Sequence, residues 1–84
     1  MDDSSRANQC EGMPTSDLRK LVGQRVRRTR ELAGLSQEEL AARARLDRTA
    51  IGKIERGERG VTIATLQKIA KSLKSSISEL LEGI

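Results

Sequence analysis

The stretch LDRTAIGKIERG, residues 46–57, combines core-type side chains with hydrogen-bond donors at helical spacing. Ile51 and Ile54 are three residues apart and would share one face of a helix, while Arg48, Thr49 and Lys53 point elsewhere. An arginine can donate to guanine O6 and N7, and a threonine can offer its methyl group to thymine. The pattern predicts a helix that is held to a core by its isoleucines and presents donors to the edges of DNA bases.

Two helices are expected before this stretch. Apolar residues recur at three- and four-residue steps over about 17–33, and Gly34 follows as a terminator. Ser36 and Glu39 then form a capping box, which predicts a second helix over about 37–44. The apolar positions of the first helix are Leu18, Leu21, Val22, Val26, Thr29, Leu32 and Ala33.

The third helix follows closely, with Asp47 as its N-cap and Gly57 at its end. Only residues 45–47 separate it from the second helix. That is the length of the turn in a helix-turn-helix, where the second helix enters the major groove of DNA.

Two more helices are expected after it. Thr62 caps a fourth helix, and Ser76 and Glu79 form a second capping box that opens a short fifth one. No segment predicts a strand, so the fold class is all-α: a compact domain of five short helices over 17–84, preceded by a flexible polar tail over 1–16. The apolar face of the fourth helix is Ile63, Leu66, Ile69, Ala70 and Leu73.

The composition excludes several classes of function. The chain has no His, and its single cysteine, Cys10, lies in the polar tail, so neither a metal site nor a nucleophile–base pair can be placed. We therefore expect no enzyme, no cofactor and no small-molecule ligand. The chain also has no aromatic residue, which disfavours binding of single-stranded nucleic acid by stacking. It contains neither the apolar run of a signal peptide nor a membrane span, and a cytoplasmic location fits.

Charge is distributed unevenly. The whole chain carries +4, and because residues 1–16 carry −2, the predicted domain carries +6. Such a balance suits a polyanionic partner, although charge alone fits an Arg-rich soluble surface equally well.

The run from LVGQRVRRTRELAGLSQEELA through IGKIERG to TLQKIAKSLKSSISELL resembles the helix-turn-helix domain of lambda-type repressors and XRE-type bacterial regulators. The resemblance covers about residues 18–82. Within it, LDRTAIGKIERGERGVTI is most similar to the controller proteins of restriction–modification systems. It implies a lambda-repressor-like fold in a bacterial or phage-encoded, nucleoid-associated protein. It also implies a homodimer that binds double-stranded DNA at a near-palindromic operator, and both activates and represses its own operon.

The resemblance also assigns roles to single residues. Arg48, Thr49 and Lys53 match base-reading positions, with a phosphate contact open for Lys53. Gly52 matches a point where the backbone approaches the DNA, or is simply a tolerated surface glycine. The residues expected at DNA phosphates are Gln37, which also buttresses the recognition helix, and Arg43, Arg45, Arg56 and Arg59.

Other matches concern structure and partners. Arg30 and Glu55 match a buried ion pair between the first and third helices, and Glu38 matches a position used to contact RNA polymerase. Arg45 departs from the family, which has Gly or Asn in a left-handed turn, so we expect a cost of roughly 1 kcal/mol. The residues expected at the dimer contact, unless they pack internally, are Ile77, Leu80, Leu81 and Ile84.

Two alternatives stay open. One is a phage or chromosomal XRE-type repressor. The other is an antitoxin-like or adaptor protein that uses the same fold to bind a protein partner, although Arg48, Thr49 and Lys53 favour DNA.

Overall fold

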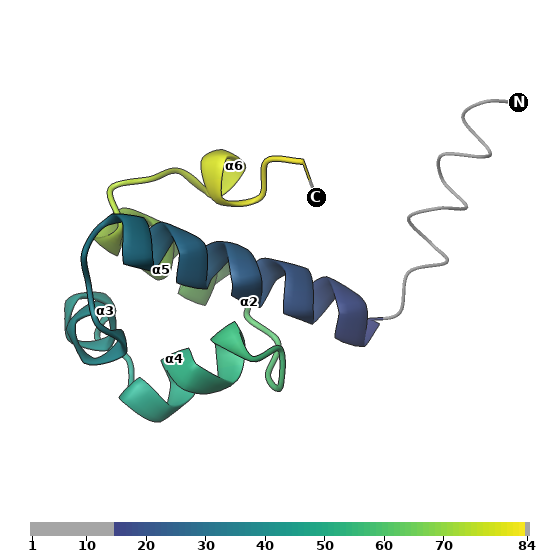
Figure 1. Cartoon of the computed structure of the whole chain (residues 1–84), viewed down its shortest axis with the longest axis horizontal. Coiled ribbons are helices and arrows are strands. Elements are labelled where there is room, and N and C mark those ends of the chain that lie inside the picture. The colour runs from purple at the N-terminus through teal and green to yellow at the C-terminus, as the bar shows by residue number, and fades with distance from the viewer. Residues whose placement is uncertain (1–14, 84) are drawn as a thin grey trace, which may run out of the picture.

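The computed structural model of the protein describes residues 15–83, which form α-helices joined by short connections and contain no strand. The helix α2 runs the length of the domain, with α4 along one side and α6 along the other (Figure 1). This confirms the expected all-α fold. Cys10 and most of the expected tail lie outside the described residues, and α2 already includes Thr15 and Ser16. The helices are α2 (Thr15–Leu32), α3 (Gln37–Ala44), α4 (Arg48–Glu55), α5 (Ile63–Ser72) and α6 (Ile77–Leu80).

The helix ends follow the expected signals with two exceptions. The capping box of α3 is complete: the Glu39 N–H donates to Ser36 Oγ over 3.0 Å, and the Ser36 N–H donates to Glu39 Oε1 over 2.9 Å. At α6 only the first of these bonds forms, because the Ser76 hydroxyl, rather than its N–H, faces the Glu79 carboxylate. Asp47 occupies the N-cap position of α4 in an extended conformation, but its side chain makes no capping hydrogen bond. Asp47 is therefore the N-cap residue, as expected, but it lacks the side-chain bond of a cap.

The core lies between α2 on one side and α3, α4 and α5 on the others. Five side chains are fully buried in it, at least one from each helix: Val26, Leu40, Ile51, Ile69 and Leu80. Burial of this kind contributes about 1.5–3 kcal/mol for each large aliphatic side chain and dominates the stability of a small helical domain.

Five predicted apolar positions are instead exposed: Leu18, Leu21, Leu32, Ala33 and Ile63. The first turns of α2 extend past the other helices (Figure 1). Leu18 and Leu21, in this part of α2, are 44% and 36% exposed. Leu32 ends α2 and Ile63 begins α5, and their side chains are 79% and 75% exposed.

The helices α2 and α4 approach each other closely at Gly23, in the middle of α2. A Cβ at this position would collide with the carbonyl oxygen of Ile54 and lie 2.7 Å from that of Glu55. The backbones of α2 and α4 therefore touch, which fixes the depth at which α4 sits on the domain.

None of the helices within residues 15–83 is both long and apolar enough to cross a membrane.

Candidate nucleic-acid interface

The helices α3 and α4 are joined by a tight turn at Arg45. Its backbone is left-handed, with φ 57° and ψ 45°. The Leu46 N–H donates to the Ala41 carbonyl over 2.8 Å, which satisfies one of the free carbonyls at the end of α3. The turn therefore keeps the family's left-handed geometry with an arginine in place of glycine, rather than adjusting to avoid it.

The outward face of α4 carries the donors that the sequence singled out. Arg48, Thr49 and Lys53 are all exposed, whereas Ile51 and Ile54 are buried in the core. The structure thus exposes all three expected base-reading side chains on α4.

Gly52 differs from expectation. It is buried, because the guanidinium of Arg56, one turn later, lies over it: a Cβ on Gly52 would be 3.0 Å from Arg56 Nη1. The Arg56 side chain therefore covers the backbone at Gly52 in this structure. Arg56 lies on the same face of α4 as Arg48.

A buried network ties α4 to α2 and α3. Arg30 Nε donates to Glu55 Oε2 over 2.7 Å and its Nη2 to Glu55 Oε1 over 3.0 Å, while its Nη1 donates to the Leu35 carbonyl over 2.8 Å. Gln37 Nε2 adds a bond of 3.1 Å to Glu55 Oε1. The hydrogen bonds to Glu55 raise the pKa of Arg30 further above its ordinary value. The charge-assisted hydrogen bonds from Arg30 to Glu55, together with the bond from Gln37, hold α4 in one orientation against α2 and α3.

Two exposed ion pairs lie on the interface itself. Glu38 Oε1, at the start of α3, is 3.7 Å from Arg48 Nε. Arg56 Nε donates to Glu58 Oε2 over 2.7 Å, and its Nη2 donates to Glu58 Oε1 over 3.4 Å. Glu58 was not among the residues predicted from the sequence, although the run ERGER puts it two residues after Arg56, just beyond the end of α4.

The remaining arginines do not form one cluster. Arg43 and Arg45 line an open groove of about 380 Å³ between α3 and α5, together with Lys68 and Lys71. Arg59 lies at the other end of the interface, in the loop after α4, where it lines a second groove with Leu18 and Arg19 of α2.

The expected dimer residues divide into three groups. Leu80 is 1% exposed and belongs to the core, so its assignment to the dimer contact was wrong: the short helix α6 needs it to pack against the domain. Ile77 and Leu81 are partly buried at the edge of the core. Ile84 lies outside the described residues.

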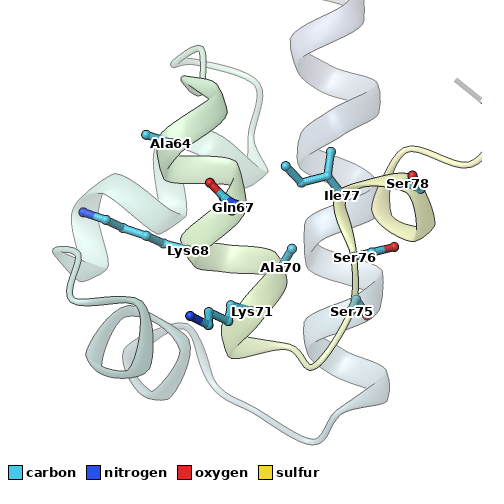
Figure 2. A pocket seen from close by; sticks show the side chains of 9 residues that line it. All are labelled: Ala64, Gln67, Lys68, Ala70, Lys71, Ser75, Ser76, Ile77 and Ser78. Atoms are coloured by element: carbon cyan, nitrogen blue, oxygen red, sulfur yellow. The ribbon is translucent and has the colours of Figure 1, made fainter.

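An open groove of about 730 Å³ runs between α5 and the segment that leads into α6. Figure 2 shows Ile77 pointing across it toward α5, with Ala64, Gln67 and Ala70 opposite. Residues 15–83 contain no group of three His, Cys, Asp or Glu side chains able to hold a metal ion.

Comparison with known proteins agrees with this geometry. The helix-turn-helix family model HTH_3 matches residues 26–80. The control protein C.SmaI of Serratia marcescens is 45% identical over 65 residues, covering 77% of each chain, and the control protein C.BamHI of Bacillus amyloliquefaciens is 42% identical over 69 residues, covering 81% of this chain and 85% of its own. The crystal structure of the restriction–modification controller protein C.AhdI from Aeromonas hydrophila matches with a TM-score of 0.74 and 41% identity, over 75% of this chain and 96% of that one.

The chain belongs to this helix-turn-helix family of DNA-binding transcriptional regulators, and it is not an enzyme. Among the relatives, the similarity to restriction–modification controller proteins extends over about three quarters of the chain.

Proposed function

We propose that this protein is a restriction–modification controller that regulates its own operon by binding double-stranded DNA. The observation that carries the proposal is the exposed face of α4, on which Arg48, Thr49 and Lys53 stand clear of the core while Glu55 is fixed from behind by Arg30. A rigid helix with free donors on one face is what reading of the major groove requires.

The place of each residue on α3, α4 and the adjoining loops indicates which part of the DNA it contacts. Arg48 and Thr49, in the first turn of α4, read bases, and Lys53 contacts a base or a phosphate. Phosphates are bound by Arg56 on the same face, by Arg59 in the loop after α4, and by three residues of α3 and the turn that follows it. The last set comprises Gln37, Arg43 and Arg45. Gln37 has one amide hydrogen committed to Glu55, so it supports α4 and offers its other donor to the DNA.

The protein acts as a homodimer through α5 and the start of α6. Ile63 is 75% exposed at the first turn of α5, and Gln67, one turn later on the same helix face, lines the groove that Ile77 crosses. The apolar side chains that a second copy would cover are Ile63, Ile77 and the partly buried Leu81. Two copies are needed because one recognition helix reads too few base pairs to select a site in a genome.

Activation requires a contact with RNA polymerase, and Glu38 on α3 is the candidate for it. Its carboxylate is exposed, but it also lies beside Arg48, so a charge reversal at Glu38 affects DNA binding as well as activation. Repression needs only occupancy of the operator.

A titration of the protein against a reporter driven by its own promoter tests the regulatory role. We expect transcription to rise at low protein concentration and fall at higher concentration. A fall at every concentration would identify a plain repressor. An unchanged reporter, together with protein binding that is insensitive to salt, would favour an adaptor that binds a protein partner.

A further inference from the structure

The residues Gly52, Arg56 and Glu58 are linked by contacts: the Arg56 side chain covers Gly52 and donates to the Glu58 carboxylate. Arg48, Gly52 and Arg56 are spaced by four residues along α4, so they share one side of the helix. Arg48 and Arg56 are exposed, and Gly52, between them, is covered by Arg56 Nη1. The guanidinium of Arg56 therefore occupies the middle of the face that the DNA meets.

Glu58 determines which edge of that guanidinium is free. Its carboxylate takes the bonds from Nε and Nη2. Because a guanidinium is planar and carries five N–H groups, the edge formed by Nη1 and the second Nη2 hydrogen faces away from Glu58. That edge can donate two parallel hydrogen bonds to one phosphate, as arginine commonly does.

The charges on this pair agree with the geometry. The hydrogen bond between the two side chains lowers the pKa of Glu58 and raises that of Arg56, so both stay charged at neutral pH.

We propose that Glu58 is a positioning residue that holds the Arg56 guanidinium over Gly52, ready to bind a DNA phosphate, and that the glycine lets the guanidinium lie close against the helix. The inference rests on the proposed DNA-binding function and deepens it. A side chain that is already ordered loses less entropy on binding, which is how a negative charge close to DNA can strengthen binding.

A double-mutant cycle tests the role of Glu58. Affinity is measured by fluorescence anisotropy, with a labelled duplex of random sequence at low salt, for the wild type, Glu58→Gln, Arg56→Ala and the double variant. We expect Arg56→Ala to weaken binding by about 10-fold or more. Glu58→Gln should weaken it by about 2- to 10-fold in the wild-type background, and not at all when Arg56 is Ala. If Glu58→Gln tightens binding equally in both backgrounds, Glu58 is merely a repulsive charge and the proposal is wrong.

A second pair of variants tests Gly52. Alanine favours a helix more than glycine does, so Gly52→Ala should leave the melting temperature unchanged or raise it, yet weaken DNA binding because its methyl group displaces the guanidinium. In the Arg56→Ala background the same change should have no effect on affinity. An equal loss in both backgrounds would mean that the methyl group strikes the DNA itself, which would overturn the role given to Arg56.

Because the labelled duplex has a random sequence, the measurement tests this inference separately from the proposed function. A phosphate contact does not depend on sequence, so its effects appear on random duplex even if no preferred operator exists. Absence of an operator would contradict the regulator, whereas an unaltered affinity of Arg56→Ala for random duplex would contradict only the positioning proposal.

Discussion

Single side chains on α4 divide into those proposed to read DNA and those that hold the helix, and we expect the two sets to respond differently to mutation. Arg48 is exposed in the first turn with its Nε near Glu38, whereas Glu55 is buried and accepts bonds from Arg30 and Gln37. Loss of the first should change specificity, and loss of the second should change stability.

Arg48→Ala should weaken operator binding by about 1–3 kcal/mol and relax the preference at one base pair of each half-site. The matched control is Arg59→Ala, which should weaken binding to all sequences alike because a phosphate contact carries no sequence information. Sequencing of the DNA retained by each variant measures both effects. An unchanged preference with Arg48→Ala would show that another residue reads that base.

Glu55→Ala should lower the free energy of unfolding by about 3–5 kcal/mol, because it leaves the Arg30 guanidinium buried without its counter-charge. The matched control is Glu31→Ala, which removes an exposed pair with Arg27 and should cost less than about 1 kcal/mol. Urea unfolding of both variants provides the comparison. Equal losses would mean that the buried network contributes no more than a surface pair.

At the scale of elements, the cap at the start of α3 and the turn between α3 and α4 fix the positions of these two helices. The bonds to Ser36 lower the pKa of Glu39 below its ordinary value of 4.5. Since the pKa is lower in the folded state, the stabilisation by Glu39 is fully present above about pH 4.5 and is lost as the pH falls through the lower folded value.

Ser36→Ala should remove the side-chain cap of α3 but raise the pKa of Glu39 only part of the way toward its ordinary value, because the backbone N–H of residue 36, whose bond is the larger cause of the lowered pKa, remains in alanine. Carboxyl NMR shifts during a pH titration follow this change. The substitution should also lower the free energy of unfolding by about 1 kcal/mol at neutral pH. A Glu39 pKa that is unchanged in the variant would show that the backbone N–H of residue 36 alone lowers it and that the Ser36 hydroxyl contributes nothing.

The turn between α3 and α4 offers a test with an internal control. Arg45 and Lys74 both have left-handed backbones, with φ of 57° and 56°. Replacing either by glycine should stabilise the fold by about 0.5–1 kcal/mol, because glycine adopts this conformation without strain. Only Arg45→Gly should also weaken DNA binding. Equal binding by the two variants would exclude Arg45 from the phosphate contacts.

The sequence predicted these elements well because their signals are local. Caps, terminating glycines and helical periodicity are properties of a few neighbouring residues, and α3 has the expected bounds. Gly23 and the cover over Gly52 were missed, since both depend on atoms of other segments or of a long flexible side chain. Leu80 was misassigned because periodicity identifies an apolar face but not what covers it.

At the scale of the whole molecule, the proposed dimer would set the distance between the two DNA-reading helices. Ile63→Glu places a charge on an exposed position of α5, so it should yield a folded monomer with reduced operator affinity. Leu32→Glu, at an equally exposed position at the end of α2, is the matched control and should leave the dimer intact. Analytical ultracentrifugation and circular dichroism distinguish the outcomes. A dimer that survives Ile63→Glu would place the contact on another surface.

The most direct test of the central claim is selection of bound duplexes from random DNA at moderate salt, followed by sequencing. A dimer with two copies of α4 should enrich an inverted repeat whose half-sites are centred one helical turn, about 34 Å, apart. The same repeat should occur upstream of the protein's own coding sequence. A folded protein that enriches no motif would contradict the claim that this face of α4 reads DNA sequence.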